Sequence, residues 1–211
     1  MSPTDVSRET LDERLEAFRF EFAKWSRRIN LTSASERGNL DERHIADSLQ
    51  LLALAPGAKR WVDIGTGGGF PGVILTAALP PGTVTMVESN NKKCAFLRSA
   101  CVAMGVRADV RAERAEAVVA RTDPPDVVSA RAVASLADLL DLLHPWLRGG
   151  TLGLFPKGRG VEAEIMEARE RHAFDVVRHP SAIARDSTVL AVTMTGTNGR
   201  TTNPMIDPSS G

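Results

Sequence analysis

The sequence predicts an α/β fold built on a seven-stranded, mostly parallel, doubly wound sheet. From residue 61 onward, short apolar runs typical of buried strands alternate with helical segments. A glycine cluster follows the first of these runs, and the last two runs have no helical segment between them. Strands separated by helices form parallel βαβ units, whereas strands joined directly are antiparallel. We therefore expect the last strand to run antiparallel to the rest.

A helical extension is expected before this domain, over residues 1–57. Apolar residues in its first part are spaced 4, 3, 4, 3 and 4 apart, which is the stripe of an amphipathic helix that packs on the domain. A second helix is expected over residues 41–55. The stripe comprises Leu11, Leu15, Phe18, Phe22, Trp25 and Ile29.

The main domain is expected over residues 58–196. Its strands are predicted over 61–65, 83–88, 108–112, 126–130, 149–155, 174–179 and 187–195, and its helices over 71–79, 91–105, 135–147 and 161–173. Between the third and fourth strands we expect a loop with the sequence "AERAEA". The tail, residues 197–211, is polar and rich in turn residues, and is predicted to be disordered.

Composition limits the classes of function. With 26 basic and 26 acidic residues the chain has no net charge, which counts mildly against a nucleic-acid partner but leaves room for a local basic patch. The charged N-terminus and the lack of a long apolar run indicate neither a signal peptide nor a membrane span. Cys94 and Cys101 lie about 10 Å apart along one predicted helix, too far for a disulfide. We expect a reduced, cytoplasmic protein.

The glycine cluster, "VDIGTGGGFPG", fits two ligand-binding patterns. Counted from Asp63 it is D-x-G-x-G-x-G, with Gly65, Gly67 and Gly69, which is the first motif of S-adenosylmethionine-dependent methyltransferases. Counted from Gly67 it is G-x-G-x-x-G, with Gly69 and Gly72, which is the dinucleotide pattern. A glycine-rich turn without a ligand is the third interpretation.

Two features favour the methyl donor. Asp63 precedes the loop, where a carboxylate can receive the cationic amino group of a methionine moiety, and a pyrophosphate has no use for it there. The strand ends near Ile64, so the dinucleotide pattern begins too late. Glu88 ends the second strand and can accept both hydroxyls of a ribose, a device that both ligands share. Ala115 and Glu116, in the loop after the third strand, are placed to reach an adenine ring.

Seven segments, the glycine cluster among them, point to one family. In order, the chain contains "NLTSAS", "RHIADSL", "DIGTGGGFPG", "ESNNKKCAFLR", "ERAE", "SARAV" and "FPKG". These resemble the bacterial small-subunit ribosomal RNA guanine-N7 methyltransferase family, called RsmG or GidB. The resemblance covers Trp25 to Lys157, with weaker agreement to Thr195. It implies a Rossmann-like methyltransferase fold and methyl transfer from S-adenosylmethionine to N7 of a guanine in 16S ribosomal RNA.

The resemblance also implies cofactor contacts at particular positions. Glu88 stands where an aspartate is commonest in the family, so the carboxylate is kept on a longer side chain. The other positions carried over are Gly65, Phe70, Ala115, Glu116 and Arg131.

Arg131, which follows the fourth strand, is the candidate catalytic residue. Guanine N7 has a free lone pair and no proton, so its methylation needs positioning and no general base. An arginine can grip guanine O6 or a neighbouring phosphate with two N–H groups. The alternative is a structural ion pair. No histidine or cysteine spacing suits a metal site, so no metal is predicted.

An upstream helix carries a second polar group. "RHIADS" places Arg43, His44, Asp47 and Ser48 within about one and a half turns. They either line the active site or fix the helix to the sheet, and the sequence does not choose between the two.

The expected partner is small-subunit ribosomal RNA or the 30S particle, bound by a monomer. A small-molecule methyltransferase and a non-catalytic adenosine-nucleotide-binding module are the alternatives. Cations that could neutralise phosphates are Arg27, Arg28, Lys92, Lys93, Arg98, Arg107, Arg111 and Arg114.

Overall fold

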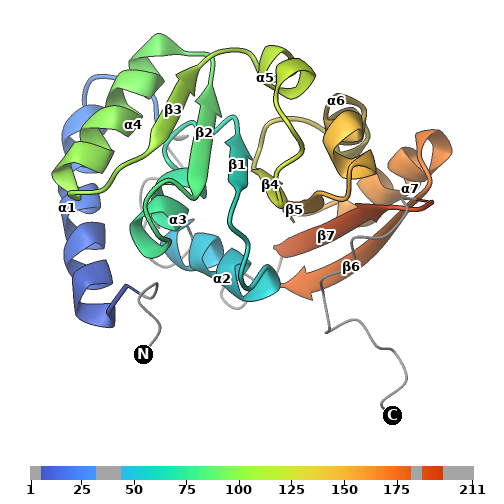
Figure 1. Cartoon of the computed structure of the whole chain (residues 1–211), viewed down its shortest axis with the longest axis horizontal. Helices are drawn as coiled ribbons and strands as arrows, with labels where there is room; N and C mark the ends of the chain where they lie inside the picture. The colour runs from blue at the N-terminus through green and yellow to red at the C-terminus, as the bar shows by residue number, and fades with distance from the viewer. Residues whose placement is uncertain (1–5, 32–43, 182–186, 197–211) are drawn as a thin grey trace.

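The computed structural model describes residues 6–31, 44–181 and 187–196. Seven strands form one sheet in the order β3-β2-β1-β4-β5-β7-β6 (Figure 1). The first five strands are parallel, and β7 is antiparallel to both β5 and β6. The predicted fold class and antiparallel last strand are confirmed. The strands are β1 (Trp61–Ile64), β2 (Val84–Glu88), β3 (Asp109–Ala112), β4 (Val127–Ala130), β5 (Leu152–Lys157), β6 (Phe174–Pro180) and β7 (Thr188–Met194).

Helices cover both faces of the sheet. Two apolar clusters lie on opposite faces, one formed with the first four helices and the other with the last three. The helices are α1 (Arg8–Ser26), α2 (Ala46–Leu54), α3 (Gly72–Ala78), α4 (Asn91–Ala103), α5 (Ala115–Arg121), α6 (Leu136–Arg148) and α7 (Val161–Arg171).

One expected loop is instead a helix. The segment "AERAEA" was predicted to be a loop, but α5 begins at Ala115 directly after the extended Arg114. Its Val118 and Val119 are buried against the second apolar cluster. The helix has only seven residues, so tertiary packing stabilises it more than any periodicity that a sequence window can detect.

The N-terminal helix α1 packs through the predicted stripe. Phe18 and Phe22 are buried and surround Phe70 of the glycine loop and Phe96 of α4. Arg14 adds a hydrogen bond of 2.7 Å from Nη1 to the carbonyl oxygen of Ala77, at the end of α3. The glycine loop is thus packed between the sheet and α1.

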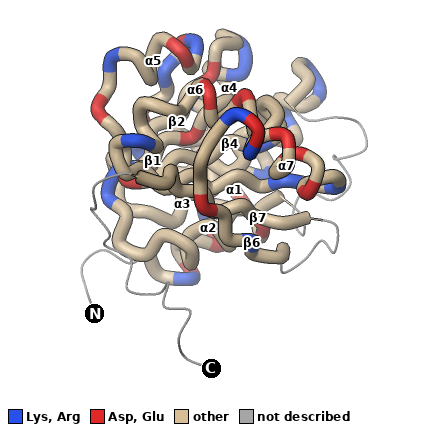
Figure 2. The backbone as a smooth tube through the Cα atoms, turned by 90° about the vertical axis from the view of Figure 1, so that its right-hand side faces the viewer, with Lys and Arg blue, Asp and Glu red and all other residues tan. Residues whose placement is uncertain are grey.

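Several expectations lie partly or wholly outside the described residues. These are the start of the second helix, including Arg43, and the tail over 197–211. Within the described part, no helix is long and apolar enough to cross a membrane. Both cysteines are buried and form no disulfide. Figure 2 shows the molecule from the right-hand side of Figure 1, with acidic and basic residues interspersed along α5 and α7.

Candidate active site

The glycine loop lies at the carboxyl edge of β1, where β2 and β4 also end. Gly65, Gly67 and Gly69 have φ angles of +66°, +56° and +96°, a region in which side chains are strained. Space is restricted as well, because a Cβ on Gly65 would lie 2.6 Å from Cγ2 of Val133. The glycines are therefore required by the turn and by the close approach of the segment after β4.

Asp63, at the end of β1, holds this loop in place through hydrogen bonds. Its side chain is fully buried, and Oδ2 accepts a hydrogen bond of 3.0 Å from the Gly72 N–H. Oδ1 accepts a hydrogen bond of 2.7 Å from the Ser129 hydroxyl, whose oxygen accepts one of 3.0 Å from Trp61 Nε1. The network joins both ends of the loop to β4. Contact between Asp63 and an amino group of a ligand stays a prediction.

Burial also changes the acidity of Asp63. Desolvation raises its pKa from 3.8 to about 6, and hydrogen bonds from Ser129, Thr66 and Gly72 and the charge of Arg131 offset only part of that rise. A carboxyl group with this pKa is ionised at neutral pH and sensitive to any further positive charge.

Glu88 sits beside the loop at the end of β2. Its Oε2 accepts a hydrogen bond of 3.1 Å from the Gly67 N–H, and its Oε1 accepts one of 2.8 Å from the Asn90 N–H. The side chain is thereby fixed at the edge where a ribose was predicted. The Glu88 carbonyl accepts from the Glu113 N–H at 3.1 Å, which brings the start of α5 to the same edge.

Ala115 and Glu116 therefore occupy the first turn of a helix at this edge. Ala115 is half-buried, whereas Glu116 is exposed and pairs with Arg114 at 3.4 Å. The ring of Phe70, another predicted contact, is buried among Phe18, Phe22 and His44. A contact between Phe70 and a ligand stays a prediction.

Arg131 links three segments. Its guanidinium Nη2 contacts His44 Nδ1, and the His44 ring lies 5.0 Å from that of Phe70. Segments before α2, after β1 and after β4 thus meet at one point. The polar residues of α2 make structural contacts. Ser48 donates a hydrogen bond of 2.6 Å to the His44 carbonyl, and Asp47 accepts one of 2.6 Å from Ser181, which follows β6.

A brace that the sequence analysis missed supports the segment after β4. The Lys157 ammonium donates to the Ala134 carbonyl at 2.8 Å and to the Glu164 carboxylate at 2.7 Å. That carboxylate also accepts from the Leu136 N–H at 2.9 Å. The only signal for this brace was the position of Lys157 in "FPKG", at the carboxyl end of β5. Ser129 and Val133 were likewise missed.

Comparison with known proteins identifies the family. Residues 11–188 match the family model GidB, described as rRNA small subunit methyltransferase G. The chain is 49% identical over 190 residues to the ribosomal RNA small subunit methyltransferase G of Brucella ovis, with 89% of each chain covered. The chain belongs to the GidB family. The resemblance found in the sequence is confirmed.

Solved structures with low sequence identity share the fold of this GidB family member. One is the ribosomal protein L11 methylase of Lactobacillus delbrueckii subsp. bulgaricus, with a TM-score of 0.57, 17% identity, and coverage of 70% of this chain and 76% of that chain. Another is a mutant of MtNAS in complex with S-adenosylmethionine, with a TM-score of 0.58, 18% identity, and coverage of 87% and 72%.

The site suits an adenosine-type methyl donor better than a metal. Among the described residues, no group of three or more histidine, cysteine or carboxylate side chains is arranged to hold a metal ion. The glycine loop is instead flanked by the Glu88 carboxylate, which accepts from the Gly67 N–H, and by the buried Asp63 carboxylate, which accepts from the Gly72 N–H. A nucleoside with a cationic end matches this set of groups.

Proposed function

We propose that this GidB family member transfers a methyl group from S-adenosylmethionine to N7 of a guanine in 16S ribosomal RNA. The observation that carries the proposal is the convergence of the glycine loop, Glu88 and Arg131 on one edge of the sheet, in a chain of this family. When bound, the cofactor supplies an electrophilic methyl group on a sulfonium.

Each residue of the edge has a role in holding that cofactor. The main chain of Gly65, Gly67 and Gly69 lies against it, and Glu88 accepts hydrogen bonds from the ribose hydroxyls. The buried carboxylate of Asp63 adds negative potential beneath the cationic end. The remaining contacts are the main chain of Phe70, the adenine-side residues Ala115 and Glu116, and Arg131.

Arg131 positions the acceptor. The lone pair of guanine N7 needs no base, so the protein must hold the base about 3–3.5 Å from the methyl group on a straight line of attack. A guanidinium can hold guanine O6 or a neighbouring phosphate with two hydrogen bonds. Contact with His44 restricts the Arg131 side chain before RNA arrives.

The test compares Arg131→Ala with Arg148→Ala. Arg148 is an exposed arginine at the end of α6, near the amino ends of the parallel strands, and serves as the control. We expect Arg131→Ala to lower the rate of RNA methylation by about 100-fold or more, since misplacement of a reacting group costs rates of this order. Full activity of Arg131→Ala, with normal S-adenosylmethionine binding, would remove Arg131 from the mechanism.

We further propose that the enzyme acts as a monomer in the cytoplasm, on the small-subunit RNA or on the assembled particle. A small-molecule methyltransferase would methylate metabolites and ignore ribosomal subunits. A non-catalytic module would bind the cofactor and label no acceptor.

A further inference from the structure

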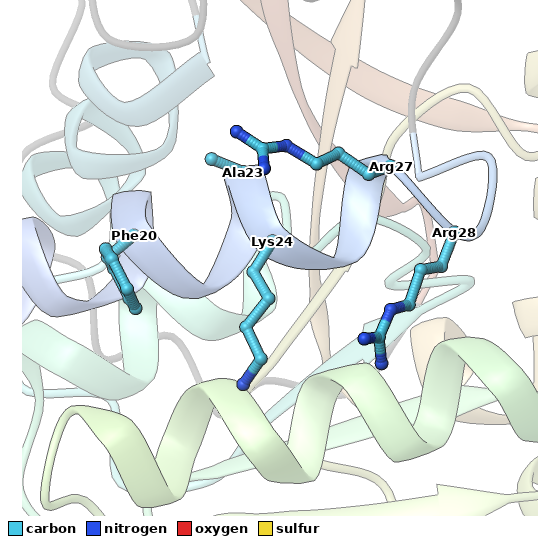
Figure 3. A pocket seen from close by; sticks show the side chains of 5 residues that line it. All are labelled: Phe20, Ala23, Lys24, Arg27 and Arg28. Atoms are coloured by element: carbon cyan, nitrogen blue, oxygen red, sulfur yellow. The ribbon is translucent and has the colours of Figure 1, made fainter.

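One side of α1 carries an exposed aromatic residue in line with cations. Phe20 is 75% exposed, and Lys24 follows it by four residues on the same face of α1. Arg28, four residues further on, lies in the turn that follows the helix and continues this row. Figure 3 shows all three on the side of α1 that faces the ribbon of α4. With Ala23 and Arg27 they line a hollow of about 350 Å³. We call Phe20, Lys24, Arg27 and Arg28 the α1 row.

Positive charge in the α1 row is largely uncompensated. The side chains of Arg27 and Arg28 form no ion pair or hydrogen bond within the described residues, and both are exposed. The Lys24 ammonium lies 3.2 Å from the buried Glu21 carboxylate, yet its side chain remains 53% exposed. Acidic residues of α1 other than Glu21 lie in the first half of the helix, at Glu9, Asp12, Glu13 and Glu16.

The α1 row leads toward the candidate active site. Glu21 accepts a hydrogen bond of 2.6 Å from Ser99, and Trp25 lies 6.1 Å from Phe96, so α1 runs antiparallel to α4. Arg28 is therefore the member nearest to the start of α4 and to the carboxyl edge of the sheet. On the other side of α1, Phe22 contacts Phe70 of the glycine loop. The α1 row thus lies about one helix diameter, roughly 10 Å, from that loop.

This combination of groups matches single-stranded RNA. Exposed aromatic rings stack on unpaired bases, and arginines beside them pair with phosphates. Cations in the last turns of a helix also complement its dipole, but that effect does not account for an exposed phenylalanine beside them. We propose that the α1 row binds the RNA strand that flanks the target guanine, an inference that rests on the proposed function. One base stacks on Phe20, and phosphates pair with Arg27 and Arg28.

The experiment measures the Kd of the full-length protein for purified small ribosomal subunits at several salt concentrations. The variants are Phe20→Ala, Phe20→Leu, Phe20→Trp and Arg28→Ala. Met166→Ala and Arg169→Ala are matched controls, because they form an exposed apolar and cationic pair on α7. Thermal unfolding and S-adenosylmethionine binding show that each variant is folded.

We expect Phe20→Ala and Arg28→Ala each to weaken subunit binding about tenfold, the usual scale for one stacked base or one phosphate contact. Phe20→Trp should keep the wild-type Kd, and Phe20→Leu should behave like Phe20→Ala because leucine has no π face. Arg28→Ala should reduce the slope of log Kd against log salt by about 0.7, as expected for one phosphate of a single strand. The controls should bind as the wild type does.

Unchanged binding, a wild-type Kd in Phe20→Leu or an unchanged salt slope would each overturn the proposal. Unchanged Kd values for Phe20→Ala and Arg28→Ala would remove the α1 row from the RNA interface, while methylation by the wild type would leave the proposed function standing. A wild-type Kd in Phe20→Leu, or an unchanged salt slope in Arg28→Ala, would indicate that the α1 row contacts a ribosomal protein and not RNA. A wild type that binds subunits through the α1 row but methylates nothing would instead contradict the proposed function alone.

Discussion

Asp63 shows how one residue joins sequence motif, fold and chemistry. The sequence predicted its place before the glycine loop and a role toward a cationic ligand. The structure adds a role that no motif reveals, since Asp63 ties Gly72 to Ser129 beneath the loop. The partner Ser129 is 66 residues away in the chain. Such contacts follow from the strand order, so a local pattern cannot predict them.

The first prediction concerns the titration of Asp63. The unfolded chain releases this proton near pH 3.8, whereas the folded protein keeps it until about pH 6. The contribution of this carboxyl group to stability is therefore full below about pH 4 and is lost as the pH rises through 6. The loss amounts to about 3 kcal/mol, since one pKa unit corresponds to about 1.4 kcal/mol.

Two measurements check this prediction. Carbon-13 NMR of the Asp63 carboxyl group should give a pKa near 6. Urea unfolding of wild type and Asp63→Asn between pH 4 and 7 should show that only the wild type loses this stability, because asparagine does not titrate. A carboxyl group that titrates at pH 4 or below would contradict the account.

At the scale of elements, the segment between β4 and α6 depends on support from its neighbours. Val133 approaches Gly65, Arg131 contacts His44, and Lys157 holds the Ala134 carbonyl. The sequence predicted both flanking elements, and the role that it assigns to Arg131 stays a prediction. It did not predict α5 or the brace from β5 and α7, because a seven-residue helix and a tertiary ion pair leave no periodic pattern.

The second prediction tests that brace with Lys157→Met. The Lys157 side chain is only 8% exposed, so its loss leaves the Ala134 carbonyl and the Glu164 carboxylate poorly satisfied. We expect the free energy of unfolding to fall by about 1–3 kcal/mol, and the methylation rate to fall by about tenfold as Arg131 loses its position.

Arg178→Met is the matched control. Arg178, on β6, forms a surface ion pair with Glu162 of α7, the helix that also carries Glu164. Its effect on stability should stay below about 1 kcal/mol, with normal activity. Equal effects of the two variants would show that the brace has no special role.

The third prediction compares two phenylalanines on α1. Phe18 is fully buried against Phe70 and Phe96, whereas Phe20 is 75% exposed. Replacement by alanine should cost about 3–5 kcal/mol at Phe18, through lost burial and a cavity. At Phe20 the cost should stay within about 0.5 kcal/mol. Urea unfolding measures both, and similar costs at the two sites would contradict the packing of α1.

On the scale of the whole molecule, the sequence predicted a doubly wound sheet with its ligand edge at the carboxyl ends of the parallel strands. The glycine cluster after β1 and Glu88 after β2 were sufficient for that, because parallel strands end at one edge. The zero net charge counted mildly against RNA, and it gave no information on how charges are distributed. The cations at the end of α1 and just after it, Lys24, Arg27 and Arg28, became meaningful only when the packing of α1 against α4 was known.

The most direct test of the account is to identify the methylated nucleoside. Wild-type protein is incubated with isotopically labelled S-adenosylmethionine and small ribosomal subunits from a strain that lacks the enzyme, and the RNA is digested and analysed. The account predicts label in 7-methylguanosine. Label in another nucleoside, or unlabelled RNA despite intact cofactor binding, would contradict it.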